Sequence, residues 1–234
     1  MIDEALAADL RAVQTATLSY QLRKRGIEST FLTGLRPLRE GAELLGEART
    51  LRYVAFRADV SKAIGGGMNA QKRVIDDIEP GEVLVIEARG EPGSGTIGDI
   101  LALRVKVRGG AGVVTDGAVR DSAAIAESGL PVWCSGSHAA VLGEKHVPMD
   151  SDLPITCAGV LVMPGDILRG DADGVVVIPR DLAGEVARAA VVQEQEERFI
   201  AERVEDGAAI DGLYPLGEEW REQFEQWEEE GDGK

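Results

Sequence analysis

The sequence predicts a single α/β domain with a mixed sheet, β-hairpins, and added N- and C-terminal helices. Its middle alternates short apolar runs, typical of buried strands, with segments of helical periodicity. Between residues 159 and 179, three short apolar runs are separated by Pro-Gly-Asp and Gly-Asp-Ala-Asp-Gly, a pattern typical of β-hairpins. The 234 residues suffice for one large domain, and they contain no repeat or low-complexity linker.

The elements follow in order along the chain. Helical patterns predict helices at residues 3–25 (in two pieces), 69–78, 96–109, 121–129, 180–206 and 217–230. Apolar runs predict strands at residues 43–56, 82–88, 111–117 and 131–136, besides the runs at 159–179. The single domain, 1–234, thus divides into N-terminal helices (1–30), an α/β core (31–180) and a C-terminal helical extension (181–234).

Composition excludes several classes of function. The net charge of -16 argues against a nucleic-acid or polybasic membrane surface, since both need clustered Lys and Arg. No apolar stretch reaches the ~18 residues of a membrane span. Cys134 and Cys157 form no CxxC pair and lie in apolar runs, which predicts buried free thiols. Since the first ten residues also lack an apolar signal-like core, we expect a soluble protein of the cytoplasm.

A glycine loop before the helix at 96–109 raises the first question of function. Gly93-x-Gly95-x-x-Gly98 follows a strand and opens a helix, and Asp116 ends the next strand, as in dinucleotide sites. Four residues separate the strand from the loop, however, and no second doubly wound half follows. A structural turn is one alternative to a dinucleotide site. The other is a smaller anion site, because free amides at a helix start favour negative charge.

A second candidate feature is the turn "VVTDGAVRDS", in which Arg120 and Asp121 follow a strand and begin the next helix. Adjacent parallel strands bring their carboxyl ends together, so this turn is expected to lie near Asp99. The alternative is a purely structural role, in which the Arg-Asp pair caps the helix.

The spacing of these features resembles a known family. Gly98-Asp99, twenty intervening residues and Arg120-Asp121 are similar to the Asp-x20-Arg-Asp signature of class II pyruvate aldolases, which act on 4-hydroxy-4-methyl-2-oxoglutarate or 4-carboxy-4-hydroxy-2-oxoadipate. "AGVVTDGAVRD" and "PGDILRGDADGVVVIP" resemble the family's other hallmarks. The family shares its fold with the RraA proteins, regulators of RNase E activity, and with chains once labelled demethylmenaquinone methyltransferases. The resemblance implies a swivelling β/β/α fold, trimers or hexamers with sites between subunits, and Mg²⁺ or Mn²⁺.

The resemblance also implies roles for individual residues. Asp121 would ligate the metal, and Asp99 would hold a metal-bound water. Arg120 would pair with the pyruvyl carboxylate and the developing enolate, since its planar fork binds a carboxylate at two points. The amides near Gly98, which belong to Ile100 and Leu101, would complete the carboxylate site. Glu196 would reach the metal from a neighbouring subunit; the alternative for Glu196 is a solvated helix face.

The implied function is a metal-dependent aldolase that cleaves a 4-hydroxy-2-oxo acid to pyruvate and a carbonyl compound. A hard cation stabilises the enolate charge as a Lewis acid, and oxaloacetate decarboxylation would pass through the same enolate. Two alternatives stay open: a non-catalytic, protein-binding regulator like those of RNase E, and a related metal-dependent lyase or hydrolase on another oxo acid.

One segment departs from the family. Where many members carry a basic "RG-x-TPRG"-like run, this chain has "CSGSHAAVLGEKHVPMD". The distal carboxylate of the substrate is then handled differently or is absent. His138 and His146, the only histidines, both lie here. Either could line the pocket and act on the C4 hydroxyl, or belong to a surface loop.

Overall fold

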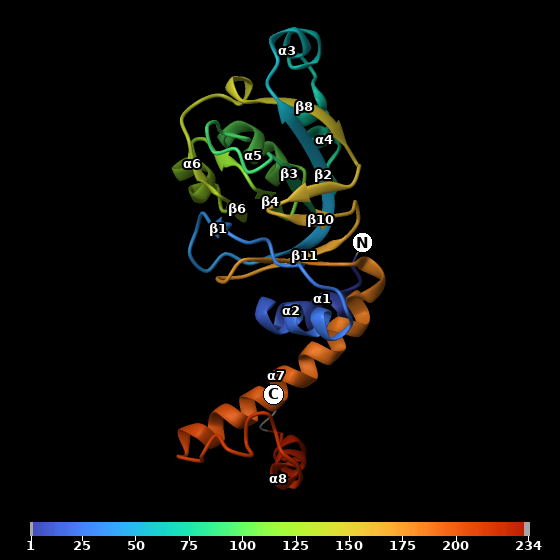
Figure 1. The fold of residues 1–234 in the computed structure, drawn as a ribbon, viewed down its shortest axis with the longest axis vertical. Coiled ribbons are helices and arrows are strands. Elements are labelled where there is room, and N and C mark those ends of the chain that lie inside the picture. Colours follow the sequence, from blue (N-terminus) through green and yellow to red (C-terminus); the bar gives the residue numbers. More distant parts are fainter. Residues whose placement is uncertain (1, 232–234) are drawn as a thin grey trace.

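The centre of the molecule is a curved, mixed sheet of eight strands, seen in a computed structural model that describes residues 2–231 (Figure 1). The strand order is β1-β6-β4-β3-β2-β11-β12, and β8 pairs with the far half of β2. The strands are β1 (Arg36–Pro37), β2 (Leu44–Ala55), β3 (Glu82–Glu87), β4 (Gly112–Thr115), β6 (Val132–Cys134), β8 (His146–Ser151), β11 (Ile167–Gly170) and β12 (Val175–Ile178).

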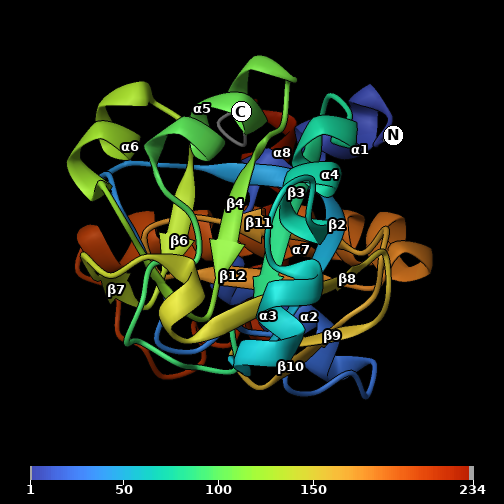
Figure 2. The ribbon, with the colours of Figure 1, turned by 90° about the horizontal axis from the view of Figure 1, so that it is seen from above.

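Four neighbouring strands, β2, β3, β4 and β6, run parallel to one another. Figure 2 shows β6, β4 and β3 side by side with their arrows pointing the same way. Their carboxyl ends therefore share one edge of the sheet, where ligands bind in open α/β sheets. The glycine loop follows β3 at this edge, and the Arg120-Asp121 turn follows β4.

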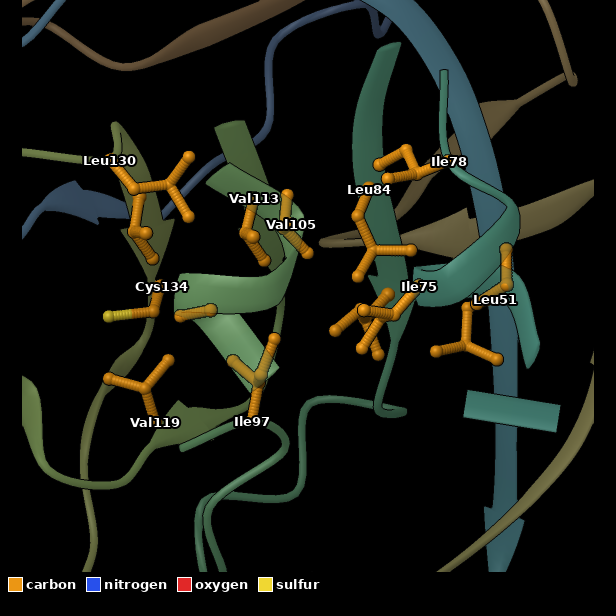
Figure 3. Close-up of a cluster of buried hydrophobic side chains, with 14 of the residues drawn as sticks. Leu51, Ile75, Ile78, Leu84, Ile97, Val105, Val113, Val119, Leu130 and Cys134 are labelled. Carbon is orange, nitrogen blue, oxygen red and sulfur yellow. The ribbon is translucent and has the colours of Figure 1, made fainter. Parts of the chain in front are cut away.

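Helices cover one face of the parallel strands. They are α4 (Ala70–Asp77), α5 (Asp99–Val107) and α6 (Ser122–Ser128). Side chains alternate along β3, because successive residues of a strand point to opposite faces. Leu84 packs under the helices (Figure 3), and Ile86 belongs to the same cluster, whereas Val83 and Val85 pack on the opposite side with Trp133. Both faces are buried, which explains why β3 is continuously apolar.

The N-terminal helices and the start of the long C-terminal helix pack together near β11 and β12 (Figure 1). These helices are α1 (Glu4–Ala12), α2 (Thr15–Lys24) and α7 (Ala183–Glu205). The far end of α7 leaves the sheet and meets α8 (Glu218–Glu229). There Phe199, Phe224 and Trp227 form a small aromatic core of their own.

Several short elements complete the fold. β5 (Ala118–Val119) pairs with β7 (Gly136–Ser137), and β9 (Ile155–Cys157) pairs with β10 (Val160–Val162). The remaining elements are α3 (Ala58–Ile64) and two 3-10 turns, η1 (Leu142–Glu144) and η2 (Arg180–Leu182).

The structure confirms the predicted mixed α/β fold with its terminal helices, and each predicted helix and strand is present to within a few residues. One expectation needs correction. The first of the three runs at 159–179 is β10, which pairs with β9; only β11 and β12 form a hairpin with each other. In α5, the apolar residues Ile100 and Val107 are 70% and 69% exposed, so they do not face the core. Among the described residues, no helix is long and apolar enough to cross a membrane.

Candidate functional site

The two sequence features, the glycine loop and the Arg120-Asp121 turn, lie against each other. Each is anchored by one buried apolar residue, Ile97 before Gly98 and Val119 before Arg120, and these two side chains lie together in the core (Figure 3). The N–H of Arg120 donates to the carbonyl of Ile97 at 2.9 Å. The twenty-residue spacing therefore joins two turns that touch through their backbones.

The glycines of the loop make room for the second turn. A Cβ on Gly95 would lie 2.1 Å from Cγ of Arg120, and a Cβ on Gly98 would lie 3.0 Å from Oδ2 of Asp121. Between them, Thr96 donates to the carbonyl of Ala118 from its N–H at 2.7 Å and its hydroxyl at 2.9 Å. The space beside Gly95 is thus filled by an arginine of the same chain, which argues against a pyrophosphate there.

Asp121 is held in an unusual conformation at the start of α6. Its φ of 52° and ψ of 38° are left-handed, a region that non-glycine residues enter only at a cost. Its carboxylate does not cap α6, and its side chain is 40% exposed. Oδ2 lies 3.7 Å from Nε of Arg120. The strained backbone therefore presents a carboxylate and a guanidinium side by side at the strand edge.

Asp99 is the first residue of α5, directly after the N-cap Gly98. Its Oδ1 accepts a hydrogen bond from the N–H of Ile100 at 2.8 Å. That amide, which we expected to bind a substrate carboxylate, thus has an internal partner. The N–H of Leu101 lies in the same first turn, where helical amides lack intrahelical acceptors.

Asp116, which matched the ribose acid of a dinucleotide site, ties loops together instead. Its carboxylate accepts from the N–H of Ala88 at 2.5 Å, of Gly90 at 2.9 Å and of Ala158 at 3.4 Å. Burial raises the pKa of this carboxyl, although the three N–H groups oppose the rise. Asp116 therefore fixes the ends of β3 and β4 relative to each other.

Two buried polar residues that the sequence did not single out also support the loop. The side chains of Gln71 and Tyr53 both donate to the carbonyl of Thr96, at 2.8 and 3.1 Å. The sequence signal for Gln71 was a glutamine on the buried face of the amphipathic α4, because a buried side-chain amide needs hydrogen-bond partners. These bonds hold the glycine loop from the side of β2 and α4.

The donor set suits a hard divalent cation. Asp99 and Asp121 supply carboxylate oxygens at one edge of the sheet. Within residues 2–231, no three or more His, Cys, Asp or Glu side chains are grouped so that they could bind a metal ion by themselves. Mg²⁺ is commonly bound by one or two carboxylates and keeps several waters, so two acids are compatible with it.

Glu196 lies on α7, which extends away from the sheet on the side opposite α5 and α6 (Figure 1). Its Oε1 accepts from Arg221 of α8 at 3.0 Å. Its neighbour Glu194 instead accepts from the N–H of Gln14 at 3.0 Å and the hydroxyl of Thr17 at 2.7 Å. Glu196 is thus not brought to the site within one chain, and its approach from a neighbouring subunit stays a prediction.

The two histidines differ in environment. His146 is buried in β8, its Nδ1 lies 3.1 Å from the guanidinium of Arg89, and its ring packs on Tyr53. Burial, and then the charge of Arg89, lower the pKa of His146 to about 4. His138 is exposed and follows β7, beside the strand that leads to Arg120.

Sequence comparison with known proteins finds a matching family. Residues 15–177 match the family described as RraA-like, Aldolase/RraA. A protein of Halalkalibacterium halodurans named "Putative 4-hydroxy-4-methyl-2-oxoglutarate aldolase" is 33% identical over 174 residues, covering 73% of this chain and 78% of that protein.

Solved structures show the same fold. An uncharacterized protein from Pseudomonas syringae aligns with a TM-score of 0.81 and 26% identity, over 91% of this chain and 94% of that one. RraAS2 of Streptomyces coelicolor, described as an unusual member of the RNase ES inhibitor RraA protein family, aligns with a TM-score of 0.77 and 36% identity, over 85% and 96%. The family match covers more than half of the chain and includes both turns of the site. The protein is therefore a member of the RraA-like, Aldolase/RraA family.

Proposed function

We propose that this protein is a divalent-metal-dependent lyase that cleaves a 4-hydroxy-2-oxo acid to pyruvate and a carbonyl compound. The observation that carries the proposal is the contact between the Gly98-Asp99 turn and the Arg120-Asp121 turn, with the Asp121 carboxylate held out of the helix cap by a left-handed backbone. A merely structural Arg-Asp pair would cap the helix and avoid that conformation.

Arg120 binds the carboxylate of the pyruvyl half in this proposal. Its guanidinium stands at the strand edge, and Nε is buried without a hydrogen-bond partner within residues 2–231. The side chain as a whole is 36% exposed, so its terminal nitrogens can bind a ligand carboxylate at two points. The amide of Leu101, at the positive end of α5, adds a second donor, and that of Ile100 would join it only after leaving Asp99.

Asp121 and Asp99 would hold Mg²⁺ or Mn²⁺, the first directly and the second through water. When bound, such a cation polarises the keto oxygen and stabilises negative charge on the pyruvyl half as a Lewis acid.

Cleavage breaks the C3–C4 bond of the substrate. The C4 hydroxyl loses its proton and becomes the carbonyl of the released product, while the electron pair of the broken bond stays on the pyruvyl half as an enolate. Asp99 would accept the hydroxyl proton, directly or through a water, and protonation of C3 would then give pyruvate. Oxaloacetate would lose CO₂ through the same enolate.

We further propose that the protein works as a homotrimer or homohexamer in which Glu196 of one chain approaches the site of the next. The position of α7 within one chain supports this, since it leaves the sheet on the side away from α5 and α6. The exposed apolar stripe of α5, formed by Ile100, Leu103 and Val107, also supports an interface beside the site.

A non-catalytic regulator is the second candidate function. It is favoured by the 36% identity to RraAS2, which is described as a member of an RNase inhibitor family. The two candidates differ in what Arg120 and Asp121 must do, because a protein-binding regulator does not convert a substrate at these residues.

Two substitutions test the lyase proposal. Arg120→Lys removes the planar fork, and Asp121→Ala removes the assigned metal ligand. Each should lower kcat/KM for pyruvate release by at least ~10²-fold, the scale of losing one key electrostatic contact in a transition state. Near-normal rates in either variant would refute the role assigned to that residue.

A further inference from the structure

His138 stands beside Arg120 although it lies outside both hallmark motifs. β5 and β7 pair in parallel, with Ala118 opposite Gly136 and Val119 opposite Ser137. One residue further along both strands are Arg120 and His138, and the N–H of His138 donates to the carbonyl of Val119 at 2.9 Å. Neighbours in register on parallel strands project to the same side of the pair. Both side chains therefore leave the strands at the same end.

A second tether ties the loop of His138 to the glycine loop. The carbonyl of Ala140 accepts from the N–H of Gly95 at 3.0 Å. Gly95 is the residue on which Arg120 packs, since a Cβ there would lie 2.1 Å from Cγ of Arg120. The segment from His138 to Ala140 thus borders Arg120 on both sides, through Val119 and through Gly95.

The imidazole of His138 is oriented by its own loop. The N–H of Ala140 donates to Nδ1 at 3.0 Å. A backbone N–H can only donate, so Nδ1 must accept, and the neutral ring carries its proton on Nε2. Nε2 has no hydrogen-bond partner in the described part of the chain, and the side chain is exposed. The ring therefore offers one fixed N–H donor toward solvent beside the guanidinium.

We propose that His138 is a specificity-determining residue, which donates a hydrogen bond from Nε2 to a carboxylate on the distal half of the substrate. The inference rests on the proposed lyase function, in which Arg120 takes the pyruvyl carboxylate, and on the position of His138 beside Arg120. An N–H bonds more strongly to a charged oxygen than to a neutral one. The site then favours dicarboxylic 4-hydroxy-2-oxo acids over analogues that end in a methyl group.

The ring acts as a donor and not as the base for the C4 hydroxyl, because its acceptor nitrogen is already bonded to Ala140. His138 thus contacts the distal carboxylate of the substrate. It does so from the segment 134–150, which stands where many members of the family carry a basic run.

The test compares wild-type protein with His138→Ala and His138→Gln, and with Val141→Ala as the control. Val141 is 50% exposed on the same loop and has no assigned role. With Mg²⁺ present, 4-hydroxy-4-methyl-2-oxoglutarate carries the distal carboxylate, and 4-hydroxy-4-methyl-2-oxopentanoate has a methyl group in its place. His138→Ala should raise KM about tenfold for the dicarboxylate only, since a lost bond to a charged group costs about that factor.

His138→Gln keeps an N–H donor and should recover part of that loss, while Val141→Ala should match the wild type. Calorimetric binding gives a readout without turnover, because 2-oxoglutarate and 2-oxopentanoate lack the C4 hydroxyl. His138→Ala should weaken 2-oxoglutarate about tenfold and leave 2-oxopentanoate unchanged.

Two failures are distinguishable. Suppose that the wild-type protein turns over both 4-hydroxy-2-oxo acids, and that His138→Ala leaves both KM values and both Kd values unchanged. The role of His138 is then wrong and the lyase proposal stands. The same conclusion follows if His138→Ala changes the values for a dicarboxylate and for its methyl analogue equally. If the wild-type protein turns over neither oxo acid, the lyase proposal fails and the inference fails with it.

Discussion

At the scale of single residues, the site depends on two glycines and one strained acid. Gly95 lets the Arg120 side chain cross the loop, and Gly98 leaves room for the Asp121 carboxylate. The left-handed backbone of Asp121 costs on the order of 1 kcal/mol or more, which the surrounding hydrogen bonds must offset. Strain of this kind is typical of functional sites.

Gly95→Ala tests the contact with Arg120. The new Cβ would lie 2.1 Å from Cγ and 2.9 Å from the backbone nitrogen of Arg120, so the guanidinium must move. We expect kcat/KM for pyruvate release to fall by ~10²-fold, as a displacement of about 1 Å does at other sites.

The matched control for that variant is Gly143→Ala, because a Cβ on Gly143 meets nothing within 4 Å and its φ is not left-handed. Circular dichroism checks that both variants fold. Wild-type rates in Gly95→Ala would show that the packing of Arg120 on the loop does not matter for turnover.

Much of the site could be predicted from residue spacing. The twenty residues between Asp99 and Arg120 span one helix, the parallel strand β4 and the short β5, so two turns at the same sheet edge follow from parallel topology. Three features could not be predicted: the left-handed backbone of Asp121, the hydrogen bond from the N–H of Ile100 to Asp99, and the hydrogen bonds that two buried side chains donate to the carbonyl of Thr96. They depend on side-chain directions that are set only when distant segments pack.

At the scale of elements, the motif "LRGDADG" holds the N-terminal helices. Arg169 is 3% exposed and donates from Nε to the carbonyl of Leu10, at the end of α1, at 2.9 Å. Asp171 accepts from the N–H and the hydroxyl of Thr15, at the start of α2, both at 2.8 Å. The end of β11 and the residue that follows it thus satisfy polar groups at two helix ends, where helical backbones lack partners.

Asp171→Ala should destabilise the fold. It leaves two buried donors of Thr15 without their acceptor, at a cost of about 1–3 kcal/mol. Urea unfolding measures the loss, and limited proteolysis near α1 and α2 should speed up.

Asp173→Ala is the control for that variant, because Asp173 is exposed and only its backbone contacts Asp171 and Arg36. Equal stability of the two variants would contradict the assigned role of Asp171.

Element prediction succeeded where apolar periodicity was strong, as in β3 and α7. It failed for β8, whose six residues contain a proline and no clear alternation, and whose pairing with β2 shifts register between Arg52 and Tyr53. It also failed for α3, a seven-residue helix that runs into three glycines and has no buried residue. Both elements are specified by neighbours distant in sequence and not by local pattern.

At the scale of the whole molecule, the core and the C-terminal arm are built differently. The arm, formed by the end of α7 with α8, holds two of the three tryptophans of the chain, Trp220 and Trp227. The family match ends at residue 177, before α7 begins. The sequence could predict the helices of the arm but not their separate aromatic core.

Stability should depend on pH through His146. Its pKa is about 4 in the folded protein, so the unfolded chain, with a pKa near 6.5, takes up the proton first as the pH falls. Stability is therefore complete above about pH 6.5 and is lost as the pH falls toward 4, by up to about 3 kcal/mol.

Urea unfolding at pH 7.5 and pH 5 measures this dependence. His146→Gln cannot take up the proton and should flatten the change in the free energy of unfolding. Asp116 and Asp166, whose pKa values burial raises, act in the opposite direction. An unchanged slope in His146→Gln would assign the dependence to other groups.

The most direct measurement for the central claim is pyruvate release from 4-hydroxy-4-methyl-2-oxoglutarate by the wild-type protein. The rate is followed with Mg²⁺, after treatment with EDTA, and after Mg²⁺ is restored in excess. The site of Asp99, Arg120 and Asp121 predicts turnover that EDTA abolishes and Mg²⁺ restores. The absence of metal-dependent pyruvate release from this substrate and from oxaloacetate would contradict the lyase and leave the regulator as the better candidate.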